Sequence, residues 1–397
     1  MRRIALPVLL TCVAVAGCGG GTRLIREPYI SVHASASQPP AQLGIPALAT
    51  KNTTRVAGAD PVADAAGVAL AVFPSGAPGT HPSAVTLAPT DDWQAAIAAS
   101  VLMSSPTRSP LLLSGATSLP TATAQALTML APTGSGVSGG AQVIRVGDVP
   151  TPKGVRSVAI TGKDPYALAA AIDRFASAAA VTPSSDVVVA SGDSPAYAMP
   201  AAGWAAESGN PVLFVNSTGV PAPTRQALLS HKRPNIYVLG PPSVIPDTVM
   251  AQLKPYGTVK RVGAADPADN SVTFAAYRDP SCPVNQPCAH VPGSFGWALR
   301  SPGHGYTLVN ASRPLDAAAA APLSASGSFG PELVVDKPSA LAPAILNYFL
   351  DYATPGYTQE GPTAAVYNHG WVIGDPSAVS LGVQAEMDSL LEATPQK

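Results

Sequence analysis

The chain has 397 residues, of which 12% are charged and 46% hydrophobic, and its formal net charge at pH 7 is −1. Charged residues make up roughly 25% of an average globular protein, and this chain shows no basic stripe, which argues against a nucleic-acid-binding protein. The 43 prolines are about twice the average usage. Together with abundant Ala, Ser and Thr they are typical of an exported envelope protein.

The N-terminus predicts a bacterial lipoprotein. Arg2 and Arg3 precede a short apolar core, residues 4–16, that is too short to span a membrane. Small residues then lead to Cys18, whose thiol takes a diacylglycerol in lipoproteins. We expect a signal peptide over residues 1–17, a Cys18 anchored on the outer face of the cell membrane by acyl chains such as palmitate, and a flexible tether over 18–52. An ordinary secretory signal with a chance cysteine is the alternative.

A strand–loop–helix–strand unit recurs three times along the rest of the chain. Its apolar strands begin after Pro110, Pro211 and Pro331. Upstream of each copy an Asp-Pro pair opens an Ala-rich helix, predicted at 62–72, 166–180 and 268–277. The spacing of about 100 residues indicates whole small modules and not a short solenoid repeat. The acids are Asp60, Asp164 and Asp266, and their repetition favours helix N-caps over catalytic acids.

With these motifs the chain resembles the cell-wall-binding repeat 2 family, whose modules occur in threes on surface proteins of Gram-positive bacteria. The resemblance covers roughly residue 53 to the C-terminus. It implies a compact arrangement of three modules around a pseudo-threefold axis, and binding to a cell-wall or surface polymer. The sequence departs from the family pattern before the central helices, where Asp316 keeps the acid but the other copies have Gln94 and Tyr197. The closing turns depart too, with Asp148, Pro241 and Asp375 in place of a second Gly.

Strands that alternate with helices predict an α/β fold of three tandem parallel-sheet modules, Rossmann- or flavodoxin-like. We expect modules at 53–150, 151–260 and 261–397, the last with an insertion over 279–296. Glu332 stands in a strand where the other copies have Leu111 and Val212. Because an isolated charge is costly to bury, Glu332 should reach solvent or be paired.

Two cysteines remain after Cys12 leaves with the signal and Cys18 is lipidated. Cys282 and Cys288 stand close together in the Pro-rich insertion. In an oxidising compartment this spacing predicts a disulfide. A metal site is the rival interpretation, but it lacks two further ligands at suitable spacing.

No catalytic, cofactor-binding or metal-binding residue is predicted, and we expect a protein that is not an enzyme. Residues 136–140 match G-x-S-x-G by letter, yet a nucleophile elbow needs a strand before it and a helix after it. A turn is the favoured interpretation. The six histidines form no metal-binding spacing.

Ligands of parallel sheets lie beyond the carboxyl ends of the strands. The possible ligand-facing loops are therefore Ser114 and Gly115, Asn216, Ser217 and Thr218, and Asp336 and Lys337. Such residues suit sugar recognition, and they also suit plain turns. The sequence favours a lipid-anchored envelope protein that binds a wall or surface polymer, a glycan, through tandem modules. The alternatives are a solute-binding or sensory lipoprotein that captures a small ligand between modules, and an envelope hydrolase without a recognisable motif.

Overall fold

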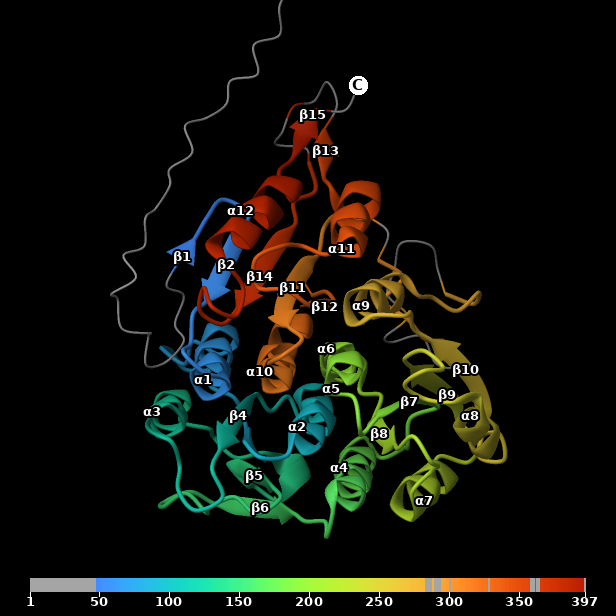
Figure 1. Cartoon of the computed structure of the whole chain (residues 1–397). Helices are drawn as coiled ribbons and strands as arrows, with labels where there is room; N and C mark the ends of the chain where they lie inside the picture. The colour runs from blue at the N-terminus through green and yellow to red at the C-terminus, as the bar shows by residue number, and fades with distance from the viewer. Residues whose placement is uncertain are drawn as a thin grey trace, which may run out of the picture. The chain divides into compact units, whose positions relative to one another are not determined.

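A computed structural model describes residues 48–282, 288, 294–299, 301–327, 329–357, 361 and 365–395 (Figure 1). The predicted signal peptide, Cys18 and residues 18–47 of the predicted tether lie outside the described residues. Within them, helices alternate with short strands in three mainly parallel sheets. The predicted α/β fold of tandem modules is confirmed. No helix of the described residues has the length and apolar character needed to span a membrane.

The first sheet has the strand order β4-β3-β5-β6, and all its pairs are parallel. Each parallel step needs a crossover connection, and helices fill most of these connections. The strands are β3 (Val85–Pro89), β4 (Leu111–Ser114), β5 (Val143–Val146) and β6 (Ser157–Ile160). The helices are α1 (Pro61–Val72), α2 (Trp93–Ala99), η1 (Ser100–Met103), α3 (Thr121–Leu130) and the short turn η2 (Gly136–Ser138).

The second sheet repeats this plan with the order β10-β9-β7-β8, again entirely parallel. Its strands are β7 (Asp186–Ser191), β8 (Val212–Val215), β9 (Asn235–Leu239) and β10 (Thr258–Val262). Its helices are α4 (Pro165–Ala179), α5 (Pro195–Ala198), α6 (Pro200–Ser208), α7 (Ala222–Ser230) and α8 (Asp247–Leu253).

The third sheet has the order β1-β2-β14-β11-β12, in which only the β1–β2 pair is antiparallel among the described strands. Its strands are β1 (Leu48–Ala49), β2 (Thr53–Val56), β11 (Gly305–Asn310), β12 (Glu332–Val335) and β14 (His369–Ile373). The helices are α9 (Pro267–Ala276), α10 (Pro314–Ser324), α11 (Pro343–Tyr348), the π-helix η3 (Phe349–Ala353) and α12 (Leu381–Leu390). A small parallel pair joins β13 (Gly356–Tyr357) to β15 (Thr394–Pro395).

The opening strand of each module pairs with the sheet of another module. β6 adds to the first sheet and β10 to the second, while β2, from the start of the described chain, pairs with β14 of the third. These three pairings therefore join the modules in a ring. Each opening strand leads into a helix capped by the expected Asp, whose side chain accepts a backbone N–H three residues on. The predicted N-caps Asp60, Asp164 and Asp266 are confirmed.

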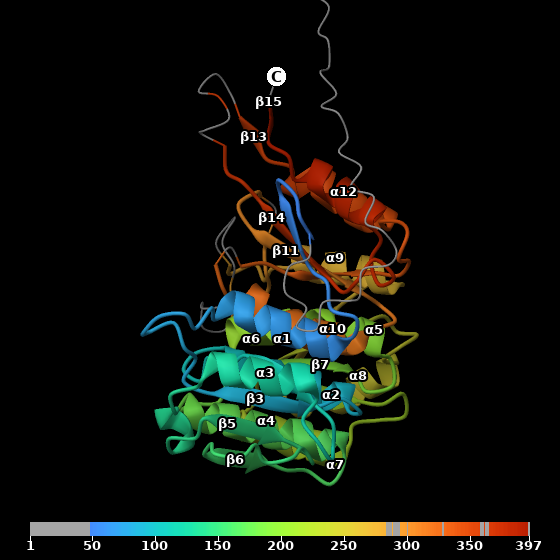
Figure 2. The same cartoon turned by 90° about the vertical axis from the view of Figure 1, so that its left-hand side faces the viewer.

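The central helices α2, α6 and α10 pack against one another and against the edge strand of a neighbouring module. α2 contacts β8, α6 contacts β12 and α10 contacts β4, which is the predicted pseudo-threefold arrangement. Figure 2 shows α1, α10 and α6 as a layer between strands of the third and first sheets. These helices are rich in alanines that are almost fully buried, such as residues 317–321 of α10. Small side chains let the helix axes approach closely at the packing density of a protein interior.

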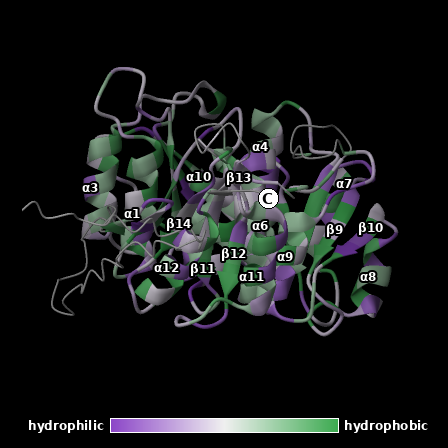
Figure 3. Ribbon diagram, turned by 90° about the horizontal axis from the view of Figure 1, so that it is seen from above, coloured by the Kyte–Doolittle hydropathy of each residue, from purple (hydrophilic) through white to green (hydrophobic). Residues whose placement is uncertain are grey.

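One apolar core joins all three modules. Leu113 of β4, Phe214 of β8 and Val334 of β12 belong to the same buried cluster. Hydrophobic colour accordingly gathers on buried strands such as β12 in Figure 3, and hydrophilic colour is frequent on peripheral segments. The prediction that the Pro-led strands occupy equivalent places in a single packed body is confirmed.

The expectation for Glu332 was wrong. Its side chain is 0% exposed, and neither carboxyl oxygen has a side-chain hydrogen-bond partner among the described residues. Gly203 of α6 lies against it, so close that an added Cβ would stand 3.1 Å from Glu332 Cγ. Burial raises the pKa of Glu332 well above its ordinary range, although the Gly203 backbone N–H opposes the shift. Burial therefore favours the neutral form of this acid, which is less costly to bury than its carboxylate.

The insertion in the third module is anchored in the interior. Cys282 and Cys288 form a disulfide, with their Cα atoms 5.6 Å apart. Phe295 stacks on Tyr237 of β9 at a centroid distance of 3.7 Å, and Trp297 meets Trp204 of α6 at 5.2 Å. We call Trp204, Phe274, Phe295 and Trp297 the aromatic interface, because they join the second and third modules.

Candidate functional site

The carboxyl ends of the strands form a similar corner in each module. In each, the first residue after the central strand donates its backbone N–H to the end of the edge strand. The bonds run from Thr90 to Ser114 O at 3.0 Å, from Gly192 to Val215 O at 2.7 Å and from Ala311 to Val335 O at 2.9 Å. Two loops therefore meet at every corner, where parallel sheets place their ligands.

The structure places the predicted ligand-facing residues in three separate corners. Ser114 is buried and its Oγ donates to Gly115 O at 3.0 Å. Asn216 folds its own loop, because its Oδ1 accepts from the backbone N–H groups of Thr218 at 3.0 Å and Gly219 at 2.8 Å. Ser217 is exposed and donates its backbone N–H to Asp193 Oδ2 at 2.8 Å. Asp336 and Lys337 are exposed in the third corner.

A cavity of about 290 Å³ opens in the first corner, between modules one and three. Thr90, Asp91 and Trp93 line it from the first module, and Ser312 and Arg313 from the third. We call these five residues the Trp93 corner. They stand at the start of α2 and just before α10, so the pseudo-threefold arrangement brings together segments that are far apart in the sequence.

Trp93 connects this corner to the second module. The edge of its half-buried ring meets Phe214 of β8 at a centroid distance of 5.7 Å. Asp91 and Ser312, by contrast, are exposed. The corner therefore combines an aromatic ring with carboxylate, hydroxyl and guanidinium groups. An apolar body with a few convergent polar groups is the composition of a ligand site.

A buried ion cluster supports the corner from beneath. Arg313 Nη2 lies 2.7 Å from Asp64 Oδ2 of α1, and Arg313 Nε lies 2.7 Å from Asp316 Oδ2 of α10. The Gly58 backbone N–H also donates to Asp64 Oδ1 at 2.8 Å. We call Asp64, Arg313 and Asp316 the charged interface, because they join modules one and three.

Burial governs the titration of this cluster. Both carboxyl groups are 0% exposed, and burial raises the pKa of Asp64 and of Asp316, although Arg313 pulls each of them down. At the same contact between modules one and three, burial lowers the pKa of Arg55 to about 10, against the attraction of Asp375 and Asp64. The Arg55 guanidinium is fixed by bonds to Gln384 Oε1 at 2.8 Å and Gly374 O at 2.7 Å. The ion pairs with Asp64 and Asp316 hold the side chain of Arg313, which lines the cavity, in one orientation.

The G-x-S-x-G match lies elsewhere and has a different local structure. Ser138 ends a 3-10 turn between α3 and β5, and its Oγ donates to Ser135 O at 3.2 Å. A strand does not lead into this segment and a helix does not follow it, so it lacks the setting of a nucleophile elbow. Within the described residues, no three His, Cys, Asp or Glu side chains are grouped so as to hold a metal ion.

Sequence reasoning named the carboxyl-end loops but missed the roles of Trp93, Asp91 and Arg313. The usable signal was an aromatic or basic residue three or four positions after a buried strand, where the central helix begins. The geometry defines a class of protein: three cyclically joined parallel-sheet modules with polar corners at the carboxyl ends of their strands.

The middle module is similar to a known family. Residues 159–250 match the family model of Cell wall binding domain 2 (CWB2), so the resemblance drawn from the sequence is confirmed. No curated protein matches the chain.

Two solved structures share the fold. Cwp8 from Clostridium difficile has a TM-score of 0.63 and 17% identity over 86% of this chain and 52% of that one. Cwp6 from Clostridium difficile has a TM-score of 0.66 and 16% identity over 86% of this chain and 48% of that one. The chain therefore spans about half the length of the structures it matches.

Proposed function

We propose that the protein binds a cell-wall polymer, a glycan, through its tandem modules, and that it is held at the outer face of the cell membrane by acyl chains on Cys18. The match of residues 159–250 to the Cell wall binding domain 2 family carries the proposal. The shared fold of the three modules supports extending it from the middle module to the whole ring.

The Trp93 corner is the strongest binding site for such a polymer. A sugar ring has an apolar face of C–H groups, which can stack on the Trp93 indole, while its hydroxyls meet Asp91, Thr90 and Ser312. Arg313 is already paired with two acids, so it orients the corner more than it attracts an anion. Ligand sites typically use such an apolar platform with a few fixed polar groups.

The other two corners supply further contacts in this proposal. Ser217 and Thr218 of the second corner and Lys337 of the third are exposed at equivalent places. A polymer that touches several corners gains affinity by avidity, because every contact after the first is intramolecular. Ser114 and Asn216 shape their loops and leave the contacts to their neighbours.

The lipid anchor would hold the binding modules at the outer face of the cell membrane. Cys18 precedes a stretch of Gly, Ser and Pro residues that separates it from β1. Two acyl chains give stable anchoring, whereas one chain binds reversibly. Mass spectrometry of the protein from its native membrane should show residues 1–17 absent and Cys18 acylated, and an intact N-terminus would contradict the anchor.

A sedimentation assay with purified cell walls tests the binding proposal. The double variant Asp91→Ala with Ser312→Ala removes two exposed groups of the Trp93 corner, and we expect about tenfold weaker binding, equal to about 1.4 kcal/mol. Asp148→Ala is the matched control, because Asp148 is an exposed acid after β5 of the same sheet, outside the corner. Equal binding by wild type and double variant would reject the corner, and no binding by wild type would reject the function.

A further inference from the structure

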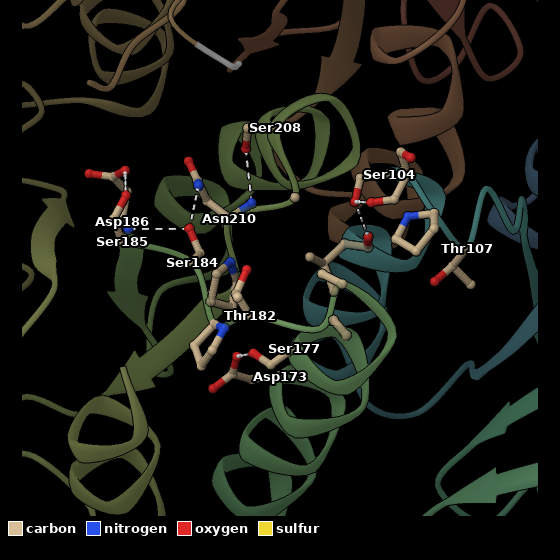
Figure 4. Close-up of a pocket in the computed structure, with 18 of the residues that line it drawn as sticks. Ser104, Thr107, Asp173, Ser177, Thr182, Ser184, Ser185, Asp186, Ser208 and Asn210 are labelled. Atoms are coloured by element: carbon tan, nitrogen blue, oxygen red, sulfur yellow. Dashed lines mark hydrogen bonds between the residues drawn. The ribbon is translucent and has the colours of Figure 1, made fainter. Parts of the chain in front are cut away.

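A second cavity, of about 400 Å³, lies at the opposite ends of the strands (Figure 4). Its walls come from the turn after η1 in module one, and from the end of α4 and the segments before β7 and β8 in module two, with Ser294 of module three as a further lining residue. We call it the amino-end groove. Hydroxyl groups dominate its lining, including those of Ser104, Ser105, Ser177, Thr182, Ser184 and Ser208.

A hydrogen-bond network holds one wall of the groove in place. Ser184 Oγ accepts from Asn210 Nδ2 at 2.9 Å and from the Asp186 backbone N–H at 3.2 Å, so its own proton is free to donate. Ser208 Oγ accepts from the Asn210 backbone N–H at 3.1 Å, and Asn210 Oδ1 accepts from the buried Trp204 Nε1 at 2.8 Å. Figure 4 shows this chain from Asp186 through Ser184 and Asn210 to Ser208. Polar groups fixed before binding lose little entropy when a ligand arrives.

The charge of the groove is small and negative. Its lining contains no Lys, Arg or His among the residues that the structure describes. Asp173 is balanced from behind by His231, whose Nε2 lies 2.9 Å from Asp173 Oδ2. The other ring nitrogen of His231 faces Ser184 O at 2.8 Å. Burial lowers the pKa of His231, but the hydrogen bond to Asp173 outweighs burial, so the pKa is raised. Asp186 is the remaining acid of the lining, and it accepts bonds from Ser185 and Asn235.

These features select a ligand by its chemistry. A phosphate or carboxylate polymer would meet the Asp186 carboxyl group and would find no Lys or Arg in the described lining, which disfavours it. A cation would find only Asp186, because Asp173 is already paired. A sugar hydroxyl both donates and accepts, as do the Ser and Thr hydroxyls of the lining. The volume is within the range of small-ligand sites.

We propose that the amino-end groove binds a stretch of neutral glycan chain, at a site separate from the Trp93 corner. The inference rests on the proposed function only in taking a polymer, and not a free sugar, as the occupant. A chain seated between modules one and two would meet hydroxyls from both of them.

Calorimetric titration of the full chain with maltohexaose and chitohexaose, two neutral chains of different linkage, tests the proposal. Ala180→Trp should fill the groove from its wall, because Ala180 is exposed there at the end of α4. Ala178→Trp is the control, an exposed position of the same helix outside the groove. We expect Ala180→Trp to weaken binding of a neutral chain at least tenfold and Ala178→Trp to leave it unchanged. Thr182→Val, an isosteric loss of one exposed hydroxyl, should weaken it by a smaller factor.

Further ligands and a variant of the Trp93 corner distinguish this proposal from binding of a free sugar, of an anionic polymer, or at the Trp93 corner. Glucose alone and poly(glycerol phosphate) should each bind at least tenfold more weakly than the neutral chain. In the background of the double variant Asp91→Ala with Ser312→Ala, which removes two groups of the Trp93 corner, Ala180→Trp should still weaken binding of the neutral chain at least tenfold. The proposal is overturned if neither neutral chain binds at about 1 mM, the weak end of specific affinity. It is equally overturned if Ala180→Trp binds as wild type does, or if glucose or the phosphate polymer binds as tightly as the chain.

Discussion

The third module meets its two neighbours through different chemistry. Towards module one it offers the charged interface, in which Arg313 lies between Asp64 and Asp316. Towards module two it offers the aromatic interface, in which Trp204 meets Phe295 at 4.7 Å and Trp297 at 5.2 Å. The pseudo-threefold arrangement is the same on both sides, so backbone geometry alone does not decide what a module contact is made of.

One position shows this directly, the residue four places after each Asp cap. In the first copy it is Asp64, which accepts the Gly58 backbone N–H at 2.8 Å and pairs with Arg313. In the third copy it is Asn270, which approaches the Ala264 backbone N–H at 3.4 Å and donates to Tyr197 O at 3.2 Å. In the second copy it is Leu168, a member of the shared core. The fold requires a side chain that fills this position. Whether that side chain is charged, polar or apolar depends on the residues that it contacts in the neighbouring module.

The largest expected effect is at the aromatic interface. Trp204→Ala should destabilise the fold by about 3–5 kcal/mol, because it removes a fully buried side chain and leaves a cavity. It also leaves Asn210 Oδ1 without its donor. Denaturant unfolding measures the loss. This cost should be nearly independent of pH between 5 and 8, and a strong pH dependence would contradict the contrast with the charged interface.

Arg313→Met should cost about 3 kcal/mol at pH 8, because it leaves two buried acids without their cation. The ordinary pKa of these acids is 3.8, and the fold already raises that of Asp316 to about 7. A raised folded pKa means that stability falls as pH rises from the unfolded towards the folded value. Without Arg313 both pKa values should rise further, so the cost should be small near pH 4 and grow steadily above it. Unfolding free energies measured from pH 4 to 8 check this, and a flat difference would refute it.

Replacing Cys282 and Cys288 together with Ser should cost about 2 kcal/mol, since the disulfide closes a short loop. Binding to cell walls should survive, because the Trp93 corner lies between the other pair of modules. The measurement combines a melting curve with the sedimentation assay. Loss of wall binding in a folded variant would show that the insertion takes part in binding.

The strands and helices of each module could be read from the sequence because their signals are local. Proline-led apolar runs, Asp-Pro caps and Ala-rich stretches each report on a few neighbouring residues. The opening strands were missed as strands: β6 and β10 are short and contain polar residues such as Ser157 and Lys260. Their partners lie in another module's sheet, and no local pattern encodes that pairing.

The candidate site, like the fold, could be predicted only where its signal was local. A general rule for parallel sheets locates loops at the carboxyl ends of strands, and it led to Ser217 and Lys337. It could not find the Trp93 corner, because Trp93 and Arg313 meet only when the ring of modules closes. The prediction for Glu332 failed for a related reason: Gly203 of α6 and Ser324 of α10 pack at the same place, and no local sequence pattern shows that this place is closed to water.

Glu332 offers the smallest and most diagnostic change. Glu332→Met keeps the length of the side chain and removes a buried carboxyl group that has no side-chain partner among the described residues. It should stabilise the protein by about 1 kcal/mol or more at pH 8, since buried polar groups without partners cost about that much. The folded pKa of Glu332 is raised, so the wild type loses stability as pH rises above the unfolded value, and the gain of the variant should grow over the same range.

Unfolding free energies of wild type and Glu332→Met at pH 5 and pH 8 measure this gain. Glu332→Gln is the control, because it keeps the shape and polarity but cannot titrate, and it should remove the pH dependence with little gain at pH 5. A variant less stable than wild type at pH 8 would mean that the carboxyl group has a stabilising role between modules two and three. The contact between these modules would then depend on a polar group, as the contact between modules one and three does.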